Sequence, residues 1–109
     1  MHELAITESL VDCISEHVGD ARVVRVVVEI GALSAVVPDA IRACFEVCSG
    51  GTPLDGAVLD VVVIEGAARC DACGTERGVT GLIESCDCGN GNLAIVRGQE
   101  LRIREVEVI

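Results

Sequence analysis

Two stretches of the chain carry apolar residues at helical spacing. In the first, Ile6, Leu10 and Ile14 recur on one side, acidic residues occupy the opposite side, and a glycine follows as a stop signal. The second opens with a proline, a residue that suits the first turn of a helix. Its apolar stripe consists of Ile41, Cys44, Phe45 and Cys48. The pattern therefore predicts two amphipathic helices, over residues 4–18 and 38–48.

β-Branched residues dominate residues 22–30, which are predicted to form a strand. Apolar and polar positions alternate there, so one set of side chains faces a core while Arg25 and Glu29 face water. The positions expected to face the core are Val24, Val26, Val28 and Ile30.

Two further strands are predicted nearer the end of the chain. Residues 57–64 are apolar on both faces, which indicates a central position in the sheet. Residues 100–109 alternate between apolar and polar positions until the pattern slips at Glu105-Val106, where we expect a β-bulge.

The segment between these last two strands, residues 66–98, has a different composition. It holds four cysteines and seven glycines but few large apolar residues, so hydrophobic burial alone can hardly fold it. We therefore predict an α/β fold, a three-stranded sheet with two helices and an inserted small zinc-ribbon-like domain. Residues 1–66 and 99–109 would form the α/β domain, and residues 67–98 the inserted one.

Charge and composition narrow the class of function. The formal net charge is −10 and Phe45 is the single aromatic residue, so the chain lacks the overall basic charge and the stacking platforms of nucleic-acid-binding proteins. The basic pairs, expected on solvated sheet faces, are Arg22 with Arg25 and Arg102 with Arg104. The first twenty residues carry five acidic side chains where a leader would be basic, and no apolar run is long enough to cross a bilayer. We expect a cytoplasmic protein with no nucleic-acid or membrane partner.

Two cysteine pairs predict a metal site. Cys70 and Cys73 have two residues between them; after twelve further residues, Cys86 and Cys88 have only one. Four converging thiolates can hold Zn²⁺ in a closed tetrahedron that leaves no position for water or substrate, so the site is structural. The one-residue spacing departs from the two-residue spacing of ordinary zinc ribbons and changes the turn. A redox-active dithiol pair and inert thiols are the alternatives.

The other three cysteines and one histidine favour a structural role. Cys13, Cys44 and Cys48 lie on the predicted apolar stripes, where small buried hydrophobes are more common than ligands. His17 lies near the end of the first helix, and we expect it to be partly buried there. No part of the chain groups a nucleophile, a base and oxyanion donors, so we predict no catalysis.

The N-terminus offers a different kind of donor set. If Met1 is retained, its amine, the His2 amide and the His2 imidazole come within chelating reach, with the Glu3 amide as a potential fourth nitrogen. A planar set of nitrogens suits Ni²⁺ or Cu²⁺, whereas Zn²⁺ prefers a tetrahedron. On these grounds alone the signal is weak, because a histidine at position 2 is common by chance.

Several different short motifs follow one another along the whole chain. They are Met1-His2-Glu3-Leu4, Glu29-Ile30-Gly31-Ala32-Leu33-Ser34, Pro38-Asp39-Ala40 with Phe45-Glu46-Val47, the cysteine pairs, and Gly98-Gln99-Glu100-Leu101-Arg102-Ile103. Together they resemble the HypA family, the nickel metallochaperones of hydrogenase maturation. One departure is Val37, which stands where members of that family often carry an acidic residue near the nickel site.

The resemblance implies a nickel-binding α/β domain with a zinc domain inserted into it. Ni(II), the transported ion, would be bound by Met1, His2 and Glu3. Structural Zn(II) would be bound by Cys70, Cys73, Cys86 and Cys88. The implied partners are a HypB-type GTPase and the large subunit of [NiFe]-hydrogenase, with urease as a further recipient in some members and a homodimer left open. The alternative function is a zinc-ribbon protein–protein adaptor without a nickel role.

Overall fold

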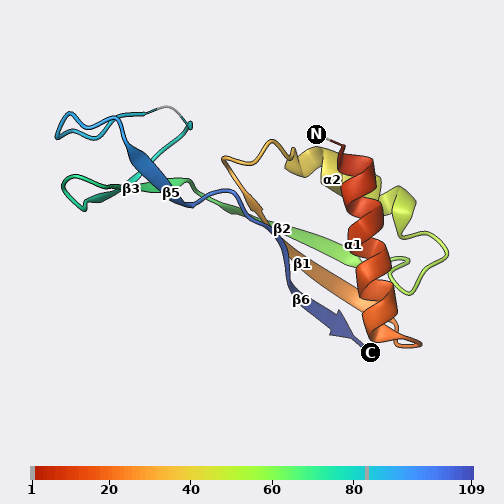
Figure 1. Cartoon of the computed structure of the whole chain (residues 1–109). Coiled ribbons are helices and arrows are strands. Elements are labelled where there is room, and N and C mark those ends of the chain that lie inside the picture. The colour runs from red at the N-terminus through yellow and green to blue at the C-terminus, as the bar shows by residue number, and fades with distance from the viewer. Residues whose placement is uncertain (1, 83) are drawn as a thin grey trace.

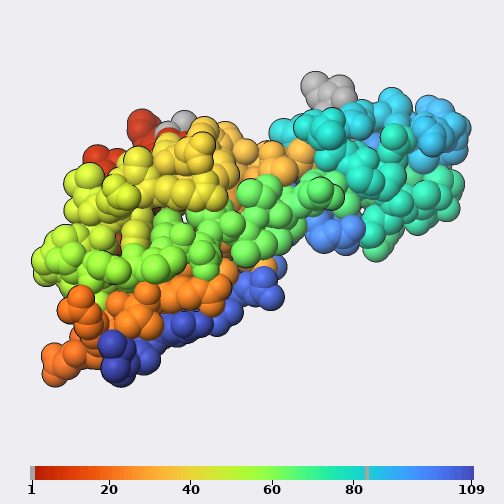
Figure 2. All heavy atoms as spheres, turned by 180° about the vertical axis from the view of Figure 1, so that it is seen from behind, coloured from red at the N-terminus to blue at the C-terminus, as the bar shows by residue number. Residues whose placement is uncertain are grey.

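A computed structural model describes residues 2–82 and 84–109 and divides them between two three-stranded sheets. Helices α1 (Glu3–Val18) and α2 (Pro38–Cys48) lie on one face of the first sheet, and the second sheet extends away from them (Figure 1). The molecule is accordingly elongated, 54 × 23 × 17 Å, and Figure 2 shows the helix-bearing lobe and the smaller second lobe end to end. The predicted fold class is confirmed. Among the described residues, no helix has the length and apolar character needed to span a membrane.

The first sheet consists of β1 (Val23–Gly31), β2 (Val58–Ile64) and β6 (Leu101–Val108), in the order β2-β1-β6. β1 pairs with β2 in parallel and with β6 antiparallel. The prediction that residues 57–64 form the central strand is therefore wrong. The chain returns from the insert on the far side of β1, which leaves the apolar strand β2 at an edge with Val58 and Val63 exposed.

One hydrophobic core lies between the helices and this sheet. α1 contributes Val11 and Ile14, and α2 contributes Ile41 and Phe45. The sheet contributes Val23, Val26, Val28 and Ile30 from β1, with Leu59, Val61, Ile103 and Val106 packed against them from the edge strands. Each fully buried aliphatic side chain of this kind stabilises the fold by about 1.5–3 kcal/mol before conformational entropy is subtracted.

Two register shifts mark the pairing of β1 with β6. The first falls between Val23 and Arg25, and Val23 is buried in the core while Val24 is only half-buried, so the expectation for Val24 was wrong. At the second shift, Val27 pairs with Glu105 but the next residue, Val28, pairs with Ile103. The extra residue is Arg104, next to the position where a bulge was predicted, and that prediction is confirmed.

Two of the four basic residues predicted on solvated sheet faces, Arg25 and Arg102, pair with acidic ones across the first sheet. The Arg25 guanidinium donates to the Asp60 carboxylate at 2.5 Å and to the Glu107 carboxylate at 2.9 Å. Arg102 pairs in the same way with Glu29. These residues are not part of the hydrophobic core, so the sheet has one apolar face and one charged face.

The second sheet consists of β3 (Ala67–Cys70), β4 (Glu76–Gly78) and β5 (Leu93–Arg97), in the antiparallel order β4-β3-β5. Its strands are short. The buried apolar residues of this lobe are mostly small: Ala67, Ala68, Cys70, Val79 and Cys86. The lobe thus has the weak apolar core that the composition of residues 66–98 led us to expect.

A close backbone crossing joins the two lobes. The Leu33 amide donates to the Gly98 carbonyl and the Gly31 amide to the Glu100 carbonyl, both at 2.7 Å. A Cβ atom on Gly31 would lie 2.0 Å from the Gly98 carbonyl oxygen, and Gly98 itself has φ +109°. Only glycine fits at these two positions, because any side chain at residue 31 would push the crossing strands apart.

Candidate metal centres

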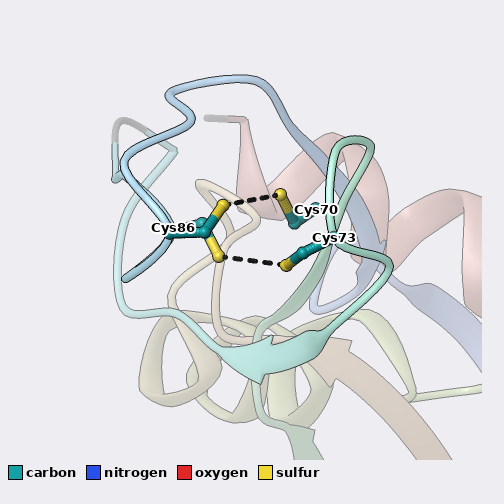
Figure 3. A group of neighbouring side chains, drawn as sticks. Cys70, Cys73 and Cys86 are labelled. Carbon is teal, nitrogen blue, oxygen red and sulfur yellow. Dashed lines mark hydrogen bonds between the residues drawn. The ribbon is translucent and has the colours of Figure 1, made fainter.

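The four predicted zinc ligands converge in the second lobe. The sulfurs of Cys70, Cys73, Cys86 and Cys88 all lie within 4.8 Å of one another. The Cys70–Cys88 and Cys73–Cys86 sulfur separations are both 3.6 Å, and Figure 3 shows the labelled side chains turned toward a common centre. Four sulfurs placed about 2.3 Å from a tetrahedral Zn²⁺ would be about 3.8 Å apart. The donor set and its spacing therefore fit zinc.

Tight turns bring each pair into position. In the first turn, the Gly74 amide donates to the Cys70 carbonyl at 3.0 Å; in the second, the Gly89 amide donates to the Cys86 carbonyl at 2.9 Å. Both glycines have positive φ, +74° and +95°. Glycine at each of these positions lets the backbone turn back on itself.

The cluster lies at the surface, with one ligand of each pair buried. Cys70 and Cys86 are buried, whereas Cys73 and Cys88 are exposed. A metal held here is consequently anchored on one side by the fold and open to chelators on the other.

Hydrogen bonds and neighbouring thiols shift the pKa values of Cys70 and Cys88 in opposite directions. The backbone N–H of Cys73, and after it the side-chain amide of Asn90, lower the pKa of Cys70 to about 6. The backbone N–H of Asn90 acts against the shift at Cys88, but the thiols of Cys86 and Cys70 raise its pKa to about 12. The thiols therefore lose their protons as a coupled set, and a bound cation would displace those that remain.

Of the three remaining cysteines, two agree with the prediction and one does not. Cys48 packs against the hydrophobic core and Cys44 is half-buried, in keeping with small apolar residues. Cys13 is exposed, so its assignment as a buried hydrophobe was wrong, and His17 is exposed as well instead of partly buried. Both lie beside an apolar groove between α1 and β6, because α1 does not cover that edge of the sheet completely.

The start of α1 carries the described part of the proposed nickel site; Met1 lies outside the described residues. His2 is exposed at the N-cap position, and its side chain makes no capping hydrogen bond. The Glu3 carboxylate accepts a hydrogen bond from the Val37 amide at 3.1 Å, which ties the start of α1 to the start of α2. This bond, followed by one from the amide of Glu3 itself, lowers the pKa of Glu3. Sequence reasoning missed the contact, since it involves the backbone of Val37 and not its side chain.

A two-helix α/β lobe with an inserted lobe that brings four thiols together defines a small two-lobed protein with one candidate metal centre among the described residues. Over residues 1–108 the chain matches the family model described as "Hydrogenase/urease nickel incorporation, metallochaperone, hypA". The chain belongs to this HypA family.

Curated relatives and solved structures agree with this assignment. The chain is 47% identical over 108 residues to "Hydrogenase maturation factor HypA" of Trichormus variabilis, covering 99% of this chain and 96% of the relative. It is 45% identical over 109 residues to the protein of the same name from Geobacter metallireducens, covering 99% of each. The "Solution structure of the Ni metallochaperone HypA from Helicobacter pylori" superposes with a TM-score of 0.69 at 28% identity, covering 100% of this chain and 98% of that one. A second structure, "Solution structure of HypA protein", gives 0.75 at 29% identity, with coverages of 100% and 97%.

Proposed function

We propose that this member of the HypA family binds Ni(II) at its N-terminus and delivers it for [NiFe]-hydrogenase maturation, while Zn(II) is held by the cysteine cluster. The observation that carries the proposal is the match to a nickel-incorporation family over residues 1–108. The name of the Helicobacter pylori structure, a Ni metallochaperone, supports the identity of the transported ion.

The start of α1 has the chemistry that a nickel chelate needs. The Met1 amine, the His2 amide and the His2 imidazole would supply nitrogens in one plane, with the Glu3 amide next in line. The first amides of a helix have no acceptor inside the helix, and here the first helical bond runs from the Ile6 amide to the His2 carbonyl. Nickel could therefore replace the proton of the His2 or Glu3 amide without breaking a helical hydrogen bond.

The cysteine cluster supplies a closed four-thiolate site, in contrast to the exposed nitrogen site at the N-terminus. When bound, zinc would cross-link the turn after β3 to the turn before β5 and so contribute folding energy to a lobe with little apolar core. Cys70, Cys73, Cys86 and Cys88 would hold it, with the buried Cys70 and Cys86 fixing its position. A closed thiolate site retains its ion, whereas an exposed terminal site can transfer it to a partner.

The proposal also covers the domain division, the partners and the location. Residues 1–66 and 99–109 would act as the nickel-binding domain and residues 67–98 as the zinc-binding domain. This is supported by the separation of the two sheets. A HypB-type GTPase and the hydrogenase large subunit would be the partners in the cytoplasm, and the protein would carry its ion without catalysing a reaction.

Nickel titration of protein with a native N-terminus tests the proposal. We expect one equivalent of Ni(II) with the spectrum of a planar, diamagnetic complex, and loss of this binding in His2→Ala. His17→Ala is the matched control, because His17 is the other histidine of the chain and is also exposed on α1. Nickel binding that survives His2→Ala unchanged would refute the N-terminal assignment.

A further inference from the structure

The shortened cysteine pair has fewer backbone N–H groups of its own than the longer pair. In the first turn, two residues separate the cysteines, so the amides of Asp71, Ala72 and Cys73 all follow Cys70. The turn between Cys86 and Cys88 contains one peptide unit fewer, so it has fewer N–H groups to offer its own sulfurs. Thiolates bound to a metal are usually stabilised by such donors.

The side chain of Asn90 reaches across the cluster to the first pair. Its Nδ2 group lies 3.4 Å from the Cys70 sulfur, and it also donates to the Asp71 carboxylate and to the Asn92 carbonyl, the latter at 3.3 Å. A further contact of this side chain runs the other way: the Asn92 amide donates to Asn90 Oδ1 at 3.2 Å.

These contacts fix the orientation of the Asn90 amide. The Asp71 carboxylate and the Asn92 carbonyl can only accept, whereas the Asn92 amide can only donate. Exchanging the nitrogen and oxygen of the side chain would turn all three contacts into repulsions. The nitrogen of this side chain therefore faces the Cys70 sulfur, and its two N–H groups are shared among three acceptors.

The backbone of Asn90 is attached to the second pair. Its carbonyl accepts a hydrogen bond from the Cys86 amide at 2.8 Å. A single half-buried residue thus contacts one cysteine of each pair, Cys70 through its side chain and Cys86 through its backbone.

We propose that Asn90 is a positioning residue that clamps the Cys86–Cys88 turn against Cys70 and thereby sets how long the cluster retains its zinc. The proposal rests on the zinc assignment made above. The N–H donor withdraws charge from the Cys70 thiolate and holds its sulfur in the direction of the metal. Without it, the sulfur would be held less firmly in the direction of the metal, and a chelator that approaches from the exposed side would remove the zinc faster.

The test is the rate of zinc release from the full chain to a chromophoric chelator at neutral pH. Asn90→Asp keeps the size of the side chain but places an anionic oxygen against the Cys70 sulfur and the Asp71 carboxylate. Asn90→Ala removes the donor without adding charge. We expect release to be about 10–100-fold faster in Asn90→Asp and about 10-fold faster in Asn90→Ala, the range typical for lost outer-shell partners of metal ligands.

Asn92→Asp is the matched control. Asn92 lies in the same loop and also donates to Asp71, at 3.3 Å, but within the described part of the chain it donates to no sulfur. The substitution adds the same charge, so we expect a rate within about threefold of wild type if the Asn90–sulfur contact is what matters. Saturating Co(II) should give the same intensity of thiolate-to-metal absorption in all variants, because the four cysteines are retained.

The possible outcomes distinguish the role of Asn90 from the zinc assignment. Wild-type protein that holds one zinc, with equal release rates in wild type and both Asn90 variants, would overturn the role of Asn90 and leave the zinc site intact. Equal acceleration in Asn92→Asp would also overturn it, since a general charge effect would then suffice. Wild-type protein that binds no zinc would overturn the zinc assignment itself, and this inference with it.

Discussion

The two lobes are stabilised by different interactions. In the helix-bearing lobe, large aliphatic residues from α1, α2 and the first sheet form one continuous core, and Ile30, Ile41 and Leu54 are almost completely buried. In the second lobe, the buried residues are mainly alanines and thiols, and the four sulfurs occupy the place of a core. The first lobe can fold by excluding water, whereas the second needs a cross-link.

This difference suits the two metals to different tasks. Zinc in the second lobe would be part of the folded structure, so losing it would mean losing the lobe. Nickel at the start of α1 would lie outside the core, on a residue whose side chain makes no capping bond, so losing it would leave the fold unchanged. A carrier protein needs its cargo at an exposed site on which the fold does not depend, as proposed here for nickel.

Removing zinc should have the largest effect, and it should be confined to one lobe. With a strong chelator under reducing conditions, amide NMR signals from residues 67–97 should collapse into the range of unfolded chains, while those of residues 3–64 and 101–108 stay dispersed. Zinc binding contributes about 10–16 kcal/mol in isolated zinc-finger domains, which is ample for a lobe of this size. Added zinc should restore the signals. Dispersed signals from β3 to β5 in metal-free protein would contradict the cross-link account.

A cavity in the core of the helix-bearing lobe should destabilise that lobe and leave the second lobe unaffected. Ile41 is 0% exposed on α2, so Ile41→Ala should lower the free energy of unfolding of the helix-bearing lobe by about 2–5 kcal/mol, measured by urea denaturation. Val47→Ala on the same helix is the control, because Val47 is 76% exposed and its truncation should change stability by about 0.5 kcal/mol or less. Zinc content should stay at one equivalent in both variants; its loss in Ile41→Ala would show that the lobes do not fold separately.

Substitution at the joint should have a smaller effect that reaches both lobes. Gly31→Ala puts a methyl group into the Gly98 carbonyl, and the resulting strain should cost about 1–3 kcal/mol in urea denaturation. Gly50→Ala is the control, since its nearest neighbour would lie at an ordinary 3.6 Å. Chemical-shift changes on both sides of the joint are expected in Gly31→Ala. Equal stability of the two variants would argue that the crossing is loose.

The smallest expected effect concerns the bond between α1 and α2. The Val37 amide holds the pKa of Glu3 below its ordinary value of 4.5. A lowered pKa in the folded state adds stability above the unfolded value, and this stability is lost as the pH falls through the lower folded value. Glu3→Gln should therefore flatten the acid end of the stability profile slightly, as measured by urea midpoints between neutral pH and pH 3. Superimposable profiles would mean that the Glu3–Val37 bond is not formed in solution.

The sequence predicted those features that depend on local spacing. Both helices, all three strands of the first sheet and the grouping of four cysteines follow from periodicity, β-branched content or the distance between thiols. The central strand could not be assigned, because strand order depends on which side of β1 the chain returns to after the insert. Val24 was misplaced for a related reason, since the bulge beside it forms only through pairing with β6.

Site residues that act through the backbone or across a loop were not predicted. Asn90 lies in a Gly-Asn-Gly-Asn run that indicates only a turn, although its position two residues after Cys88 was a usable signal. Cys13 and His17 were placed too deep, because helical periodicity gives the direction of a side chain and not how far the sheet beneath it extends.

Native mass spectrometry of the intact chain with both ions tests the central claim most directly. With one equivalent each of zinc and nickel, the protein should carry one of each. A variant with a single residue added before Met1 should keep the zinc and lose the nickel, because the extension converts the terminal amine into a peptide bond. Nickel retained by the extended chain, or nickel bound only where zinc has been displaced, would contradict the account of two chemically separate metal centres.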